Sequence, residues 1–272
     1  MQEKKMIKIA ILGAGGRMGQ AIIRCVRRLD GLKVVAAIEA KQCPLMGKDA
    51  GIVAGTMDIG VLITDDVRKG ADKADVLIDF SFPSSSAKHA LLAAELKKPI
   101  VVGTTGLNKE EKEFLKKASA KTAVLWSPNM SLSVNILDAV IGRIAKALAN
   151  YDIEIIETHH AHKTDAPSGT ALRLAETAAV ARGVHLDNTA VYGRKGNSGE
   201  RTPGQIGVHA VRAGDVVGDH TVIFAAEGER LELTHRASSR DCFALGALRA
   251  AQWIVKRPHG FYDMRDVLGL RE

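Results

Sequence analysis

The sequence predicts an α/β protein whose first half forms a parallel sheet and whose second half forms a separate α+β unit. Before Pro128, short and nearly continuous apolar segments alternate with helical segments, which is typical of βαβ units with strands buried on both faces. After Pro128, a long amphipathic stretch is followed by shorter β-like segments separated by turns. This second pattern favours an open sheet that is antiparallel or mixed.

The predicted elements follow from these patterns in order along the chain. The strands of the first half are expected at 7–12, 32–38, 61–64, 76–80, 100–103 and 123–126, and the helices between them at 18–29, 84–97 and 109–119. Strands that alternate with helices in this way form a doubly wound sheet with helices on both faces. The second half is expected to contain a helix at 131–150, a strand at 152–158, antiparallel strands at 208–211, 221–226 and 231–234, and a final helix at 243–255.

The composition is that of a globular protein, with 272 residues, 46% hydrophobic and 25% charged. The net charge of +7 would suit a polyanion, but the basic residues are scattered and aromatic residues make up only 4%, which argues against nucleic-acid binding. The three cysteines form no C-x-x-C pair, so neither a disulfide framework nor a structural zinc site is expected. The first apolar run is too short to cross a membrane, and we expect a cytoplasmic protein.

A glycine-rich turn, GAGGRMG at 13–19, joins the first predicted strand to the first predicted helix. Gly13 permits the tight turn, and Gly19 lets the helix pack closely on the sheet. Gly15 and Gly16 leave room for backbone N–H groups to approach a pyrophosphate at the helix N-terminus. This context predicts a Rossmann-like dinucleotide site.

Glu39 ends the second predicted strand, 20 residues beyond Gly19 (39 − 19), where a carboxylate commonly accepts hydrogen bonds from the adenosine ribose. Two further strand ends, 103–106 (GTTG) and 127–130 (SPNM), are expected to line the nicotinamide half of the site. The spacing departs from G-x-G-x-x-G because Met18 occupies its last glycine position. The alternative is a glycine-rich turn without a ligand, but strand, glycines, helix and acid in register favour the dinucleotide.

Three histidines and a lysine follow the predicted strand 152–158, namely His159, His160, His162 and Lys163. Imidazole is the side chain best suited to proton transfer near neutral pH, and a partly desolvated lysine can act as an acid. Two other interpretations are open at this point. The cluster can bind zinc, although no cysteine and no H-x-x-x-H pair stands nearby, or it can be a solvated polar loop.

Ser168 precedes a predicted helix at 171–181 and is a natural N-cap. The N–H groups of Gly169 and Thr170 would then be first-turn donors. A substrate carboxylate fits such a helix start, beside the cationic Lys163. A dinucleotide site, proton donors and a carboxylate site together predict hydride transfer onto a small acidic molecule, without a metal ion.

The sequence resembles the 4-hydroxy-tetrahydrodipicolinate reductase (dihydrodipicolinate reductase) family of the diaminopimelate and lysine pathway. The matching stretches follow the family's order along nearly the whole chain: GAGGRMG (13–19), VGTTG (102–106), SPNMSLSVN (127–135), EIIETHHAHKTDAPSGTA (154–171), RAGDVVGDH (212–220) and HRASSR (235–240). The His-rich segment is highly specific, whereas the glycine-rich turn alone would not be.

The resemblance implies an NAD(P)H-dependent oxidoreductase that reduces a cyclic imine dicarboxylate and assembles as a homotetramer. It implies a dinucleotide-binding domain at 1–130 with 240–272, and a substrate-binding and oligomerisation domain at 131–239. His159 and Lys163 are the expected proton-transfer residues, and Arg240 is expected to serve as an anchor or a hinge at the junction of the two domains.

The expected binding residues fall into two groups. Those for the substrate are His160, Lys163, Ser168, Gly169 and Thr170. Those for the cofactor are Gly13, Ala14, Gly15, Gly16, Arg17, Met18, Glu39, Gly103, Thr104, Thr105, Ser127, Pro128, Asn129 and Met130.

The cofactor preference depends on the residue after Glu39. Many relatives carry a basic residue there, where it can pair with the 2′-phosphate of NADPH, but this chain has Ala40. Glu39 alone favours NADH because a carboxylate repels the phosphate, whereas Arg17 or Lys41 can compensate. We therefore expect either cofactor, with NADH preferred.

Two alternative functions are weighed against the reductase. One is a related amino-acid pathway dehydrogenase of the aspartate or homoserine type, but those families lack the HHAHKTDAPSGT run. The other is a redox-sensing regulator that binds NAD(H) and then DNA. Such a regulator needs a helix-turn-helix or a basic reading element, and the sequence offers neither.

Overall fold

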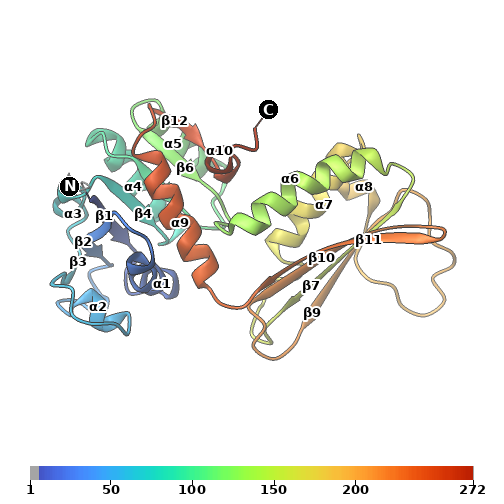
Figure 1. Ribbon diagram of the computed structural model, residues 1–272, viewed down its shortest axis with the longest axis horizontal. Helices are drawn as coiled ribbons and strands as arrows, with labels where there is room; N and C mark the ends of the chain where they lie inside the picture. Colours follow the sequence, from blue (N-terminus) through green and yellow to red (C-terminus); the bar gives the residue numbers. More distant parts are fainter. Residues whose placement is uncertain (1–5, 272) are drawn as a thin grey trace. The chain divides into compact units, whose positions relative to one another are not determined.

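The computed structural model describes residues 6–271, which form two compact units (Figure 1). The first unit comprises the chain up to Leu132 together with the segment from Arg240 onward, and the second comprises Ser133–Ser239. Across the described range, no helix is both long and apolar enough to span a membrane.

The first unit contains a seven-stranded sheet in the order β12-β6-β5-β4-β1-β2-β3, and every pair of neighbours is parallel. The strands are β1 (Ile7–Leu12), β2 (Leu32–Ile38), β3 (Ile63–Thr64), β4 (Val76–Asp79), β5 (Ile100–Val102), β6 (Ala123–Trp126) and β12 (Gly260–Tyr262). From β1 the chain winds to β2 and β3 on one side, and from β4 it winds the other way. The direction therefore reverses between β1 and β4, and ligands of such sheets bind outside the carboxyl ends of the strands at this point.

Helices cover both faces of this sheet. They are α1 (Arg17–Cys25), α2 (Ala50–Val53), α3 (Val67–Lys73), α4 (Pro83–Glu95), α5 (Lys109–Ser119), α9 (Asp241–Ile254) and α10 (Met264–Leu268), with a 3-10 turn η1 (Val26–Arg28) after α1. Alternate residues of β1 enter opposite cores, because Ile9 and Ile11 pack with α1 and α9 while Ala10 and Leu12 pack with α3, α4 and α5. The predicted doubly wound α/β fold is confirmed.

Several predicted bounds in this unit are wrong. The strand expected at 61–64 contains only Ile63–Thr64, because the N–H of Val61 donates to the carboxylate of Asp49 (2.9 Å) instead of to a neighbouring strand. The helix expected at 243–255 is not the last element, since β12 and α10 follow it. The unpredicted α3 has the sequence VRKGADK, in which too few apolar residues recur to give a helical stripe.

The second unit contains a five-stranded sheet in the order β11-β10-β7-β9-β8. Its strands are β7 (Asp152–His159), β8 (Ala190–Val191), β9 (Ile206–Arg212), β10 (Gly218–Ala226) and β11 (Glu229–Ala237). The predicted open sheet, antiparallel or mixed, is confirmed as a mixed sheet: β7, β10 and β11 pair antiparallel, but β9, which we expected to be antiparallel, runs parallel to β7. The reason is the long connection from β7, which carries α7 (Gly169–Ala181) and α8 (Leu186–Thr189) and returns the chain to the same end of the sheet.

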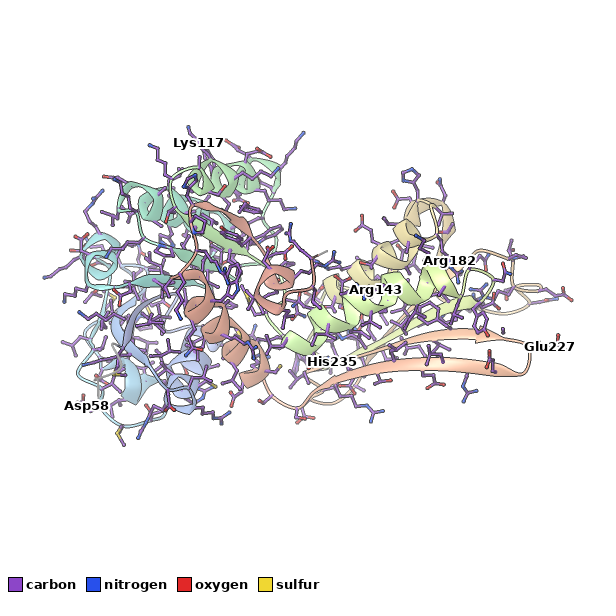
Figure 2. All side chains as sticks on the ribbon, turned by 45° about the horizontal axis from the view of Figure 1, so that its top comes forward. Asp58, Lys117, Arg143, Arg182, Glu227 and His235 are labelled. Atoms are coloured by element: carbon purple, nitrogen blue, oxygen red, sulfur yellow. The ribbon has the colours of Figure 1, made fainter. Side chains whose placement is uncertain are left out.

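Two helices, α6 (Leu132–Ala147) and α7, cover one face of this second sheet (Figure 1). Ile153 and Ile155 of β7 are fully buried against them, whereas Ile156 points to the opposite face and is 36% exposed. Arg182, labelled in Figure 2, follows α7 and donates to the carbonyl oxygens of Leu148 (2.8 Å) and Tyr151 (2.6 Å). This side chain ties the end of α7 to the turn between α6 and β7.

Candidate active site

The alternation of β7 places an acid on the apolar face of the second sheet. Glu157 and His159 are in phase with Ile153 and Ile155, so they continue the helix-covered face toward the end of the strand. The Glu157 side chain is fully buried. A buried carboxylate is tolerated only where it is paired and hydrogen-bonded, so its partners define the local structure.

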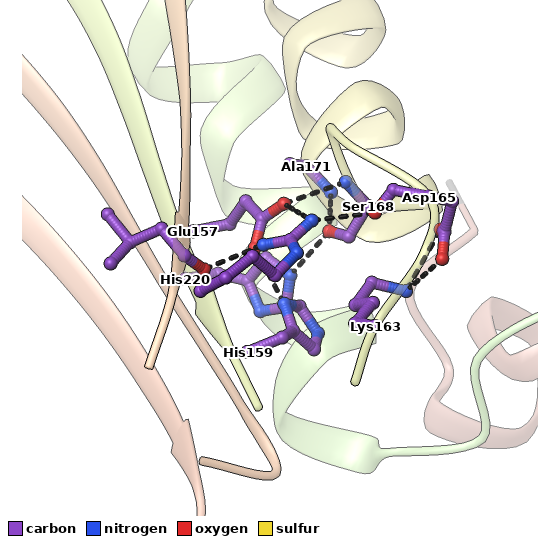
Figure 3. Close-up of polar contacts among 9 residues, drawn as sticks. Glu157, His159, Lys163, Asp165, Ser168, Ala171 and His220 are labelled. Carbon is purple, nitrogen blue, oxygen red and sulfur yellow. Dashed lines mark hydrogen bonds and ion pairs between the residues drawn. The ribbon is translucent and has the colours of Figure 1, made fainter. Parts of the chain in front are cut away.

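Four hydrogen bonds satisfy Glu157 (Figure 3). Arg212 donates from Nη1 to Oε2 (2.8 Å) and from Nη2 to Oε1 (2.9 Å), the Ser168 N–H donates to Oε1 (2.9 Å), and His159 Nδ1 lies 2.6 Å from Oε2. Burial opposes ionisation of Glu157, but the hydrogen bonds from Arg212 and His159 outweigh it and lower its pKa. Glu157 is therefore an ionised acceptor at neutral pH.

The strand register brings the partners of Glu157 together. Arg212 ends β9 directly opposite His159, and His220 of β10 lies directly opposite Glu157. These residues stand more than 50 positions away along the chain. The RAGDVVGDH stretch that begins at Arg212 was the only sequence signal for them, and their contacts were not predicted.

The contact with Glu157 fixes the tautomer of His159. An ionised carboxylate can only accept, so Nδ1 of His159 carries the hydrogen and Nε2 of the neutral ring has a free lone pair. A Cβ atom at Gly218 would lie only 2.9 Å from this Nε2, so the glycine leaves space beside it. The His159 side chain is 12% exposed.

Ser168 begins α7 as the sequence predicts, because its Oγ accepts from the Ala171 N–H (3.1 Å). Its Oγ also lies 3.0 Å from Nε2 of His220. Burial, reinforced by the nearby His159, lowers the pKa of His220 to about 3, so the His220 ring is neutral, and a hydrogen bond joins its Nε2 to the Ser168 hydroxyl. The hydroxyl of Ser168, expected to bind substrate, is thus engaged within the protein.

Lys163 lies in the turn between β7 and α7. Its Nζ contacts both carboxylate oxygens of Asp165, at 2.7 and 2.9 Å, and this contact lowers the pKa of Asp165. The turn is held to the sheet by Arg212, which donates to the Asp165 carbonyl oxygen (2.6 Å). Because Asp165 is an exposed partner, Lys163 can exchange it for another anion.

The remaining predicted substrate residues lie around the same turn. His160 and Thr170 are half-buried, and a Cβ at Gly169 would meet nothing within 4 Å, so the start of α7 borders open space. His162 is exposed. Within residues 6–271, no group of three or more His, Cys, Asp or Glu side chains is arranged to hold a metal ion.

The glycine-rich turn of the first unit lies at the carboxyl end of β1. The helix α1 begins at Arg17, and no side chain caps its N-terminus at Gly16. A Cβ at Gly13 would lie 2.7 Å from the carbonyl oxygen of Phe80, and one at Gly19 would lie equally close to that of Ala14. Both positions therefore require glycine, and the first-turn N–H groups of α1, which no side chain caps, remain available to an anion.

Glu39 contacts this turn directly. Its Oε1 accepts from the Gly15 N–H (2.8 Å) and its Oε2 accepts from the Ala40 N–H (3.1 Å). A cavity of about 410 Å³ lies beside it, lined among others by Gly13, Gly16, Glu39, Ala40, Lys41 and Phe80. This volume and these groups fit the adenosine end of a dinucleotide.

The other predicted cofactor segments follow β5 and β6. Thr104 is buried and accepts from Ser86 Oγ (2.7 Å), while Ser127 Oγ donates to the Asn129 carbonyl oxygen (2.7 Å). Met130 is buried. These hydrogen bonds hold both segments at the same end of the sheet as the glycine-rich turn.

Sequence reasoning missed the segment after β4. Asp79 is fully buried and accepts from the Ser81 N–H (2.8 Å), the Ser81 hydroxyl (2.6 Å) and His89 Nδ1 (2.7 Å). The Phe80 ring occupies the space that a Cβ at Gly103 would need. An acid at the end of an apolar strand in the sequence VLIDFSFP was the available signal.

Together the two units define a class of protein, an oxidoreductase with a Rossmann-like dinucleotide unit and a second unit that carries proton-transfer groups. Residues 7–130 match the family described as "Dihydrodipicolinate reductase, N-terminus", and residues 133–268 match "Dihydrodipicolinate reductase, C-terminus". The chain belongs to the dihydrodipicolinate reductase family, as its sequence motifs predicted. Enzymes of this family use NAD(P)H.

Individual relatives agree with this assignment. The chain is 49% identical to the 4-hydroxy-tetrahydrodipicolinate reductase of Halorhodospira halophila, over 96% of this chain and 98% of that one. It is also 49% identical to the reductase of the same name from Anaeromyxobacter dehalogenans strain 2CP-1, over 98% and 99% of the two chains. A dipicolinate-bound dihydrodipicolinate reductase from Paenisporosarcina sp. TG-14 has the same fold, with a TM-score of 0.73 at 24% identity over 95% and 97% of the chains.

Proposed function

We propose that this chain is a 4-hydroxy-tetrahydrodipicolinate reductase of diaminopimelate and lysine biosynthesis. Its substrate would be the cyclic imine dicarboxylate formed when 4-hydroxy-tetrahydrodipicolinate loses water, and its product tetrahydrodipicolinate. The observation that carries this proposal is the end of β7, where the free Nε2 of His159, the Lys163 ammonium and the start of α7 occur together (Figure 3).

The reduction needs one hydride and one proton. NADH or NADPH would supply the hydride when bound, and the protein would supply the proton from His159 or Lys163. Lys163 can act in two ways, since its charge stabilises electron density that develops on the ring and its Nζ can donate. Its exposed partner Asp165 would release it when a substrate carboxylate arrives.

The two substrate carboxylates would bind at the start of α7. Gly169 and Thr170 form its first turn, where backbone N–H groups and the positive end of the helix dipole favour an anion. His160 would contact a carboxylate from the turn after β7. The Paenisporosarcina enzyme carries dipicolinate, a planar dicarboxylate of the same chemical class, and this supports the assignment.

The first unit would hold the dinucleotide through the glycine-rich turn, with Glu39 on the ribose hydroxyls. We propose a preference for NADH, because Ala40 offers no cation for a 2′-phosphate and Glu39 repels one. The ratio of kcat/KM for NADH to that for NADPH tests this preference. A ratio below one would refute it.

The second unit would also form the contacts of a homotetramer. Among residues 6–271, no helix covers the sheet face opposite α6 and α7, and Ile156 and Val211 are exposed there, by 36% and 42%. Open sheet faces with exposed β-branched residues are typical of surfaces that pair with another copy. This support is independent of the active site.

Substitution of Lys163 tests the proposed function. Lys163→Ala should bind NADH normally and lose about 10²-fold or more in kcat, the usual contribution of a general acid. Lys146→Ala, an exposed lysine on α6, is the matched control and should keep full activity. Unimpaired turnover of Lys163→Ala would remove Lys163 from the mechanism, and a wild-type protein that fails to oxidise NADH with the substrate would refute the function itself.

A further inference from the structure

Beyond the proposed proton-transfer residues, we propose that Glu157 and Arg212 are positioning residues that hold His159 in one tautomer and one orientation. This inference rests on the proposed function, because it concerns the proton that His159 would transfer. Glu157 keeps hydrogen on Nδ1, so that Nε2 is the nitrogen that exchanges a proton with the substrate. Arg212 keeps Glu157 in place and offsets its charge.

The hydrogen-bond geometry distinguishes this role from that of a simple buried ion pair. Arg212 and the Ser168 N–H already supply three donors to Glu157, at 2.8 to 2.9 Å. The remaining donor is His159, and its contact is the shortest of the four at 2.6 Å. Since buried ion pairs contribute little net stability compared with apolar residues of similar size, a purely structural role explains this arrangement poorly.

Charged and neutral groups from three strands and one turn surround the His159 ring. Glu157 faces its Nδ1 from β7, Arg212 neutralises Glu157 from β9, and neutral His220 contacts the ring edge-on from β10, with ring centroids 5.2 Å apart. Lys163 and its partner Asp165 lie in the turn that follows β7. The Arg212 guanidinium offsets the charge of Glu157, so the carboxylate that holds the His159 ring is not left as an uncompensated buried charge.

The step is balanced without a further reactant. The Nε2–H bond of the imidazolium would break as the proton forms a new bond to the substrate, and NADH or NADPH, when bound, would supply the hydride. The His159 ring becomes neutral with its hydrogen on Nδ1, still donated to Glu157, and Nε2 is then reprotonated by the solvent, which supplies the one H+ that the net reduction consumes. Glu157 stays ionised throughout, as its lowered pKa requires.

Glu157→Gln tests the inference directly. For the amide oxygen of the Glu157→Gln side chain to accept from His159, the amide NH2 group must face the Ser168 N–H and Arg212. These groups are donors themselves, so this orientation is unfavourable. We expect the amide to donate to His159 in part of the molecules, so ¹⁵N NMR of the His159 ring should show hydrogen on Nε2 where the wild type has it on Nδ1. We expect kcat to fall about tenfold to 100-fold, as for other residues that orient a reacting group, with KM for NADH unchanged.

Glu154→Gln is the matched control. Glu154 lies on the same strand and is likewise held by Arg194, Arg201 and His209, but on the opposite face of the sheet. This variant should keep both kcat and the His159 tautomer, even where its stability falls. Arg212→Lys supplies a second test, because a lysine cannot bind both oxygens of Glu157; we expect lower kcat and a heterogeneous His159 signal even if Glu157→Gln does not fold.

The outcomes separate this inference from the function on which it rests. If the wild type is active and both Glu157→Gln and Arg212→Lys keep the Nδ1–H tautomer of His159 and the wild-type kcat, the inference is overturned while the proposed function stands. Loss of kcat in Glu154→Gln to the same extent as in Glu157→Gln would also overturn it, since a general loss of order would then explain both. A wild type without substrate-dependent NADH oxidation would overturn the proposed function.

Discussion

Gly218→Ala is the substitution that most directly probes the space beside His159. Gly218 is the first residue of β10, and a Cβ there would lie 2.9 Å from Nε2, 3.3 Å from Cδ2 and 3.7 Å from Cε1 of the imidazole. The ring cannot move away freely, because its Nδ1 is held 2.6 Å from the Glu157 carboxylate. The added methyl group must therefore displace the ring or cover the nitrogen that exchanges the proton.

The size of the effect follows from these distances. Ordinary contact begins at 3.4 Å, so the imidazole must shift by about 0.5 Å (3.4 − 2.9), and the methyl group still covers Nε2. Misplacement of a reacting group by about 1 Å costs on the order of 100-fold in rate. We expect kcat to fall between about tenfold and 100-fold, measured as substrate-dependent NADH oxidation, with the dissociation constant of NADH unchanged.

Gly207→Ala is the control for a general effect of alanine in this sheet. A Cβ at Gly207 would overlap the carboxylate of Glu154, far along β7 from His159, so this variant should lose stability and keep its chemistry. Gly218 has a φ of +159°, a backbone conformation that residues with a Cβ rarely adopt, so Gly218→Ala should also lose stability, and its kcat should be measured well below its unfolding temperature. Wild-type kcat in Gly218→Ala would refute the assignment of Nε2 as the proton-transfer atom.

Three further predictions test other parts of the structure. Ala40→Arg places a cation beside Glu39 in the cavity of about 410 Å³. A charge-assisted hydrogen bond to the 2′-phosphate should raise kcat/KM for NADPH, relative to kcat/KM for NADH, about tenfold or more. An unchanged ratio would show that the phosphate does not lie there. In Glu154, burial opposes ionisation, but hydrogen bonds from Arg194, His209 and Arg201 lower its pKa from 4.5 to about 2. Ionised Glu154 therefore adds to the free energy of unfolding fully above pH 4.5, and this contribution is lost as the pH falls to about 2. At about 1.4 kcal/mol per pKa unit, the contribution is about 3 kcal/mol. In Glu154→Gln this pH dependence should disappear, as measured by urea unfolding at several pH values. Ile156→Glu puts a charge on the helix-free face and should shift the assembly from tetramer to smaller species by light scattering, whereas a wild-type protein that is already monomeric would refute the tetramer.

The fold of the first unit was predictable because its strands are short, nearly continuous apolar segments that alternate with helices in a repeated order. Elements without such a signal were missed. The strand β12 (Gly260–Tyr262) has three residues and exists because it pairs with β6 at the edge of the sheet, and this pairing depends on tertiary structure. The candidate site residues His159, Lys163 and Ser168 could be singled out for a different reason, since they lie within one short segment of the chain.

The partners of Glu157 show where sequence reasoning stops. The alternation of β7 alone indicates that an acid at 157 shares the face of Ile153 and Ile155, so a buried carboxylate with partners could have been inferred. Its partner Arg212 could not be inferred, because the position of Arg212 depends on the direction of β9. If β9 ran antiparallel to β7, as the short β-like segments suggested, the last residue of β9, Arg212, would lie near the start of β7 and not beside His159. The parallel crossover through α7 brings the ends of β7 and β9 together. The connection therefore provides the start of α7, where we propose that a substrate carboxylate binds, and also places Arg212 of β9 beside Glu157.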